Sequence, residues 1–132
     1  MAGFSTFLAQ KIIDHTLRGS SYTMPGTLYL ALFTGDPTDN NVTANEATGA
    51  WYARVATGSW SAAIGTGNSS SNSNAIVFNA VTGSSIAISH WGIYDASTSG
   101  NLLYSDAFPS PRVMSVGDIA TIAASGLTLT FS

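Results

Sequence analysis

Residues 27–33 read TLYLALF, an alternation of large side chains with a period of two. In a strand with this sequence the three leucines face one side, and Tyr29, Ala31 and Phe33 face the other. Neither side is polar, so the pattern predicts a strand that is covered on both faces. The Gly-Asp-Pro turn at 35–37 follows closely and predicts the end of this strand.

The same period of two recurs along the rest of the chain. Strands are predicted at 51–57, 60–64, 75–80, 86–93, 102–107, 113–116, 119–123 and 127–131. Pro109 and Pro111 interrupt the series, and Gly92 indicates a bulge or a close backbone approach. The polar stretch 39–49 is predicted to be a long loop, and the Gly/Ser/Asn-rich stretch 65–74 the most flexible surface loop. One helix followed by about eight or nine short strands is typical of an antiparallel β-sandwich or barrel.

The one predicted helix lies near the start of the chain, over about residues 4–18. Apolar side chains at spacings of three and four form its stripe: Phe4, Phe7, Leu8 and Ile12, widened by Ile13 and Leu17. Gly19 suits the C-terminal cap, and Arg18 stands at the negative end of the helix dipole. Because so short a helix is marginal alone, its apolar face must dock on the chain's own sheet or on a neighbouring subunit.

Charge is scarce in this chain. Only 8% of the residues are charged, against about 25% in an ordinary soluble domain, while 45% are hydrophobic. Ser, Thr, Asn and Gly stand where Lys and Glu are usual, and such a surface is dehydrated at low cost. This favours a part of a permanent assembly, and the length of 132 residues predicts a single domain, 1–132.

The composition also argues against several partners. The net charge is −3 and the four basic residues are scattered, so no basic stripe is available for nucleic acid and no basic cluster for a lipid surface. No apolar run approaches the ~20 residues of a membrane span, and we expect no signal peptide, since no positive segment precedes Phe4. Cysteine is absent, which rules out disulfides and thiolate metal sites.

The residues suited to catalysis or metal binding are few. His15 and His90 are the only histidines, and His90 has Asp95 in the following turn as a potential partner. Three acids in one polar region could offer oxygens to Ca²⁺: Asp36, Asp39 and Glu46. Their spacing fits no EF-hand, and Asp36 is better explained by the turn. The remaining acids are interpreted as solvated loop residues rather than a glycosidase pair. We therefore predict no catalytic residue, no metal and no cofactor.

Aromatic residues offer two interpretations. The set comprises Trp51, Tyr52, Trp60, Trp91 and Tyr94. Such side chains form sugar-binding platforms or interface hot spots, but they also fill the cores of sandwiches. The core interpretation is preferred for the set, and Trp51, Tyr52 and Trp60 are kept as candidates for an interface.

Several stretches of the chain form a recognisable set: DH at 14–15, YTMPGTLYLALFT at 22–34, DPTD at 36–39, YARV at 52–55, HWGIYDA at 90–96, GNLL at 100–103 and LTLT at 127–130. Together they resemble a family of small virion proteins of tailed bacteriophages. Members are often labelled tail fibre proteins, and some look like head decoration, or cement, proteins. The resemblance spans nearly the whole chain. It implies a jelly-roll-like β-sandwich and carries over no catalytic residue.

The function predicted from these observations is structural. The chain is expected to be a capsid decoration (cement) protein that binds the major capsid protein on the outer face of the head as a homo-oligomer, a trimer by analogy. Its interface would use Phe4, Phe7, Leu8 and Ile12 or the aromatic candidates. The alternative is a tail fibre or receptor-binding module, located on the tail. An enzyme, such as a cell-wall hydrolase, and a secreted lectin unrelated to viruses are weaker possibilities.

Overall fold

The protein is an antiparallel β-sandwich with one N-terminal α-helix, which confirms the predicted fold class. Its structure, a computed structural model, describes residues 3–130; the predicted strand end at Phe131 lies outside them. The helices are α1 (Thr6–Leu17) and the short 3₁₀ helix η1 (Thr43–Asn45). The strands are β1 (Gly3–Phe4), β2 (Tyr29–Phe33), β3 (Val55–Ala56), β4 (Ser69–Ser71), β5 (Ile76–Ala80), β6 (Ile86–Tyr94), β7 (Leu102–Met114), β8 (Ile119–Ile122) and β9 (Thr128–Thr130).

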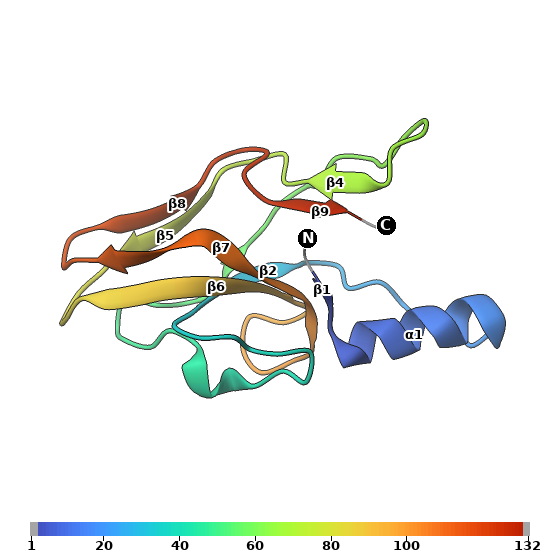
Figure 1. Ribbon diagram of the computed structural model, residues 1–132, viewed down its shortest axis with the longest axis horizontal. Helices are drawn as coiled ribbons and strands as arrows, with labels where there is room; N and C mark the ends of the chain where they lie inside the picture. The colour runs from blue at the N-terminus through green and yellow to red at the C-terminus, as the bar shows by residue number, and fades with distance from the viewer. Residues whose placement is uncertain (1–2, 131–132) are drawn as a thin grey trace.

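The strands form two unequal layers (Figure 1). One layer is a five-stranded sheet in the order β1-β7-β6-β2-β3. The other is a ribbon in which β4 pairs with β9 and β5 pairs with β8. Because β4 runs on into β5 and β8 into β9, the two pairs form one long, bent, two-stranded ribbon. Helix α1 projects from one end of the molecule.

Strand β2 is covered on both faces, as its sequence predicts. Leu30 and Leu32 lie in the main core together with Ile76 and Phe78 of the ribbon. On the opposite face, Ala31 and Phe33 form a second buried cluster with Tyr94 and Leu102. Four of the five residues of β2 are buried, so this strand is the centre of the sandwich.

Gly92 marks a close approach in this second cluster. It pairs with Ala31 across the β2–β6 ladder. A Cβ atom at Gly92 would lie 2.8 Å from Cδ1 of Leu102 and 3.2 Å from the ring of Phe33. The glycine is therefore needed for space, which is one of the two interpretations that its position in the strand allowed.

The sequence analysis expected Pro109 and Pro111 to separate two strands, at 102–107 and 113–116. The structure has a single strand here, β7. One strand runs from Leu102 to Met114. Its pairing with β6, however, jumps from His90↔Ala107 to Ile88↔Arg112, so residues 108–111 bulge out of the ladder. Pro109 and Pro111 lie in this bulge, where no partner strand needs their missing N–H groups.

The stretch 65–74 is not one flexible loop, and this prediction is wrong. Ser69–Ser71 forms β4, and Asn72 is fully buried. The side-chain amide of Asn72 donates to the carbonyls of Asn74 (2.8 Å) and Ala123 (2.9 Å), and its oxygen accepts from the N–H of Leu127 (2.9 Å). These bonds hold the bend of the ribbon, and they depend on tertiary neighbours that composition does not reveal.

Two other expected strands are shorter than predicted. Of 51–57 only Val55–Ala56 is a strand. The segment 60–64 contributes a single bridge between Trp60 and Asn72.

Helix α1 begins two residues later than predicted. Phe4 belongs to β1, where it pairs with Tyr104 and packs against its ring at 5.4 Å. Ser5 is the N-cap, and its hydroxyl accepts from the N–H of Leu8 at 3.0 Å. At the other end Arg18 is the C-cap residue and Gly19 has a φ of +68°, which fits the expected cap.

Candidate interaction surfaces

Most of the aromatic candidates belong to the core. Trp51 is 5% exposed, and Trp91 and Tyr94 are buried with it. Tyr52 stacks on Phe78 with 6.3 Å between the ring centroids. Trp51, Trp91 and Tyr94 therefore do not form an exposed sugar-binding platform. Trp51 is buried and Tyr52 is half-buried, and their interface roles remain predictions.

Trp60, the third aromatic interface candidate, is less buried than Trp51. It is half-buried, and its indole N–H donates to the hydroxyl of Thr57 at 3.0 Å. Its interface role remains a prediction.

The main polar feature of the described chain is a buried ion pair between Arg54 and Glu46. The guanidinium of Arg54 binds the carboxylate of Glu46 through two bonds, Nε to Oε1 at 2.7 Å and Nη2 to Oε2 at 2.8 Å. Nη1 donates to the carbonyls of Ala96 (3.1 Å) and Ser99 (2.6 Å), and the guanidinium lies 3.6 Å from the centre of the Tyr94 ring. The cluster ties the β6–β7 loop to the segment before β3.

The surroundings of this cluster fix the charge of each member. Burial raises the pKa of Tyr52, and its hydrogen bond to Glu46 at 2.8 Å raises it further. Burial raises the pKa of Tyr94 to about 12, although the charge of Arg54 acts in the opposite direction. Burial alone would raise the pKa of Glu46, but the hydrogen bonds from Arg54 and Tyr52 and the charge of Arg54 lower it overall. A carboxylate held this way is a structural anion rather than a proton donor.

This cluster was missed by the sequence analysis. The available signals were a lone arginine, Arg54, in an apolar stretch and an acid, Glu46, eight positions earlier. Sequence alone does not reveal that the two face one another.

The other polar candidates are also engaged. His90 Nδ1 shares a hydrogen bond with the hydroxyl of Ser89 at 2.8 Å, and Asp95 accepts from the backbone and side chain of Asn101. Asp36 accepts from the N–H of Thr38, as expected for a turn acid. Within residues 3–130, no group of three or more His, Asp or Glu side chains is placed to hold a metal ion.

The apolar side chains predicted to form one stripe on the helix differ in burial: some pack against the protein and others are exposed to solvent. Leu8 is the one buried residue of α1. Phe7 and Ile12 are half-buried, and Phe7 packs edge-on against Tyr22 at 6.2 Å. The outer turns remain open, because Ile13 is 53% and Leu17 79% exposed. We call these two side chains the α1 patch.

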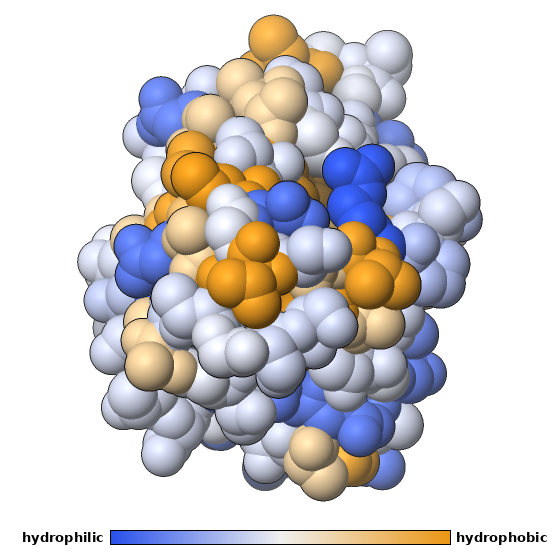
Figure 2. All heavy atoms as spheres, turned by 90° about the vertical axis from the view of Figure 1, so that its left-hand side faces the viewer, coloured by the Kyte–Doolittle hydropathy of each residue, from blue (hydrophilic) through white to orange (hydrophobic). Residues whose placement is uncertain are grey.

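A cleft opens at the opposite end of the molecule, between β7 and β8. It encloses about 620 Å³ and is lined mainly by apolar side chains: Leu32, Ile88, Phe108, Met114, Ile119 and Ile122. The polar side chains at its wall include Arg112 and Asp118. Figure 2 views this end from outside and shows apolar side chains gathered in its middle, with strongly hydrophilic groups beside them. We call it the β7–β8 cleft.

The cleft forms because the two layers of the sandwich differ in width. A two-stranded ribbon is narrower than a five-stranded sheet, and the bulge at 108–111 carries β7 away from its neighbour β6. The prolines that were expected to end a strand therefore help to form this opening.

The fold and these surfaces define a class of protein: a small β-sandwich with exposed apolar side chains at both ends and a buried, hydrogen-bonded ion pair, Arg54–Glu46. The family model for "Podophage GP4 fiber I protein gp80" matches residues 3–130. The chain belongs to this family, and it is a bacteriophage virion protein. A search of the curated proteins finds no match.

The described part of the chain holds no helix with the length and hydropathy needed to cross a membrane.

Proposed function

We propose that this protein is a non-enzymatic structural subunit of a phage fibre at the tail of the virion. Its family supports the fibre alternative better than the capsid-decoration function predicted first. The observation that carries the proposal is the α1 patch: large apolar side chains stand exposed on a helix that projects from the sandwich. These two neighbouring apolar side chains would be stabilised by contact with another virion subunit, because the contact removes them from water.

The mechanism that we propose is permanent packing. A surface with few charges gives up little hydration when it is covered, so apolar burial is offset by only a small desolvation cost. Each subunit that binds only the assembled structure then stabilises that structure by mass action.

An absence of catalysis is part of the same proposal. The strongest polar cluster, around Arg54 and Glu46, is saturated by internal hydrogen bonds. His90 is held by Ser89. Asp95, the acid expected as a partner of His90, binds Asn101 instead, so it does not orient the imidazole in a catalytic triad.

Labelling of intact virions tests the proposal. A gold-labelled antibody against the folded chain should bind at fibres, in a copy number that matches the fibres. Label spread over the head shell in a much larger copy number would overturn the fibre assignment. It would restore the decoration function, with the major capsid protein as partner.

A further inference from the structure

The β7–β8 cleft is bounded on one side by the edge of a strand. Four consecutive residues, Ile119 to Ile122, line it, and they make up the whole of β8. Successive side chains of a strand point to opposite faces of its sheet. Consecutive residues therefore reach the same opening only where that opening runs along the edge of their strand. The backbone edge of β8 is thus one wall of the cleft.

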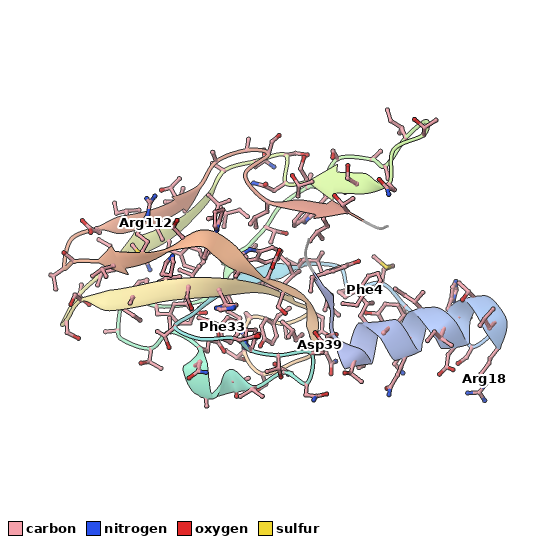
Figure 3. All side chains as sticks on the ribbon, in the orientation of Figure 1. Phe4, Arg18, Phe33, Asp39 and Arg112 are labelled. Carbon is pink, nitrogen blue, oxygen red and sulfur yellow. The ribbon has the colours of Figure 1, made fainter. Side chains whose placement is uncertain are left out.

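The floor of the cleft is a face of the five-stranded sheet. Ile88 and Arg112 both line it, and they are cross-strand partners in β6 and β7, so their side chains share a face. Met114, two positions after Arg112, lies on that face and belongs to the main core together with Ile88. Figure 3 shows Arg112 at this opening, at the end of the molecule away from α1. A hollow between a sheet face and a strand edge is the place that a further strand of the second layer would occupy.

The edge of β8 at the cleft has no ladder partner. β8 pairs with β5, and within residues 3–130 no strand pairs with its other side. In an antiparallel ladder, the backbone groups of alternate residues point to opposite edges of the strand. The N–H and C=O groups of β8 that do not face β5 therefore face the cleft, where they can form a second ladder.

The sequence of β8 leaves this edge unprotected. Free edges of natural sheets are commonly blocked by charged side chains or prolines. The sequence of β8 is IATI, which contains neither, and Ile119 is 56% exposed. β7, by contrast, carries Pro109, Pro111 and Arg112. Of the two strands at the cleft, β8 is the one suited to accept a partner strand.

We propose that an extended segment of another virion protein adds to β8 in this cleft, as the third strand of the second layer. The occupant is a peptide because only a peptide backbone offers N–H and C=O groups at the spacing of the β8 edge. The side chains that it turns toward the floor are apolar, since they contact Ile88 and Met114, and those between them face outward. The inference deepens the proposed structural role by giving the kind of contact, and it rests on that role for its setting.

The donor of the segment is a different chain rather than a second copy. All nine strands of residues 3–130 already belong to a ladder within one copy. A second copy would have to break one of these ladders before it could donate a strand. A partner with an unpaired extended segment loses no ladder when it binds.

Amide hydrogen exchange tests the added ladder directly. Mass spectrometry compares the isolated protein with the same chain in intact virions. In virions, the amides of β8 that exchange fast in the isolated protein should exchange at least about tenfold more slowly, because they gain partners. The exposed loop 65–67 lies outside the cleft and is the control segment. No slowing in β8, or a slowing no greater than in the loop, overturns the inference.

Proline at one of two neighbouring positions removes a single donor from the proposed ladder. The N–H groups of Ala120 and Thr121 point to opposite edges of β8, so one faces β5 and the other faces the cleft. Of Ala120→Pro and Thr121→Pro, the variant that keeps the wild-type Tm identifies the position whose N–H faces the cleft. Quantitative mass spectrometry of purified virions should find at least about tenfold less of that variant than of the wild type.

The matched control is serine at the same position, Ala120→Ser or Thr121→Ser, which keeps the N–H and should enter virions normally. Normal entry of the folded proline variant contradicts the inference. If both proline variants unfold, hydrogen exchange decides.

Photo-cross-linking in virions identifies the donor. A benzophenone side chain introduced at Thr121 should form a covalent adduct with a different virion protein, within a segment of alternating apolar residues. The same group at Val42, which is exposed and outside the cleft, should not label that segment. An adduct with a second copy alone overturns the choice of donor. The antibody label tests the fibre role separately: label on the head would remove that role and leave the strand addition to be judged by hydrogen exchange.

Discussion

Asn72 holds the bend of the two-stranded ribbon, and it provides the clearest prediction for a single residue. Its fully buried amide makes three hydrogen bonds to the backbone. Asn72→Ala would leave those backbone groups without partners, and each buried orphan costs about 1–3 kcal/mol. We expect a loss of about 3 kcal/mol in the free energy of unfolding, measured by urea denaturation.

The control for this prediction is a second asparagine. Asn79 is exposed and makes one long hydrogen bond, 3.3 Å, to the carbonyl of Trp51. Asn79→Ala should lose no more than about 0.5 kcal/mol. Equal losses at the two positions would contradict the role assigned to Asn72.

The lowered pKa of Glu46 predicts how the free energy of unfolding changes at acid pH. Its pKa is lowered in the folded protein, so it contributes stability above its unfolded pKa of about 4.3. This contribution is lost as the pH falls through the lower, folded value. Glu46→Gln removes it at every pH, because Arg54 then faces a neutral amide. The difference in unfolding free energy between wild type and variant should therefore shrink from neutral pH to about pH 3.

Denaturation at a series of pH values measures this difference. The other acids titrate in both proteins, so they cancel in the comparison. If the difference in unfolding free energy between wild type and Glu46→Gln stays constant down to about pH 3, the Arg54–Glu46 charge pair does not stabilise the fold.

The residue scale is also where sequence reasoning reached its limit. The role of Gly92 was predictable, because a glycine inside an apolar strand needs a steric reason. The partners of Asn72 and Arg54 were not, because they lie 51 and 42 positions further along the chain, at Ala123 and Ala96. Only the folded topology brings such residues together.

Among the elements, α1 is stabilised by its N-cap residue, Ser5, which directly precedes the helix. Ser5 is buried, and its hydroxyl caps the helix by accepting from the N–H of Leu8. Ser5→Ala should cost about 1 kcal/mol of stability, measured by urea denaturation. Ser20→Ala is the control: that serine is exposed, and it binds Asp14 through its backbone N–H. A loss at Ser20 as large as at Ser5 would contradict the capping role.

The elements with strong alternation were the predictable ones. The cores of β2, β5, β6 and β8 all fall inside predicted strands, because one or both of their faces are apolar. β4 was missed because three serines carry no hydrophobic pattern. β7 was divided wrongly because proline was read as the end of a strand, whereas here it occupies a bulge.

At the scale of the whole molecule, the scarcity of charge predicts how assembly responds to salt. Raising NaCl from about 0.1 M to about 1 M shortens the Debye length from about 10 Å to about 3 Å. An association driven by the apolar α1 patch should change its Kd by less than about threefold over this range. Analytical ultracentrifugation of the wild type measures this, and a tenfold weakening would indicate that ion pairs dominate the contact.

The virion class could be predicted from the whole sequence, but the place on the virion could not. The stretches 22–34 and 90–96 that carry the resemblance form buried strands of the sandwich and the segments beside them. The distinction between head and tail depends on exposed surfaces, and the important one, the β7–β8 cleft, is lined by residues from four strands.

The direction of the strands has a mechanical consequence. β6 and β7 run along the longest axis of the molecule (Figure 1), and the hydrogen bonds between antiparallel strands stand perpendicular to them. Tension applied from end to end therefore shears the whole ladder at once instead of unzipping it bond by bond. A subunit built this way shares a pulling force among many bonds, and it resists tension best along its own longest axis.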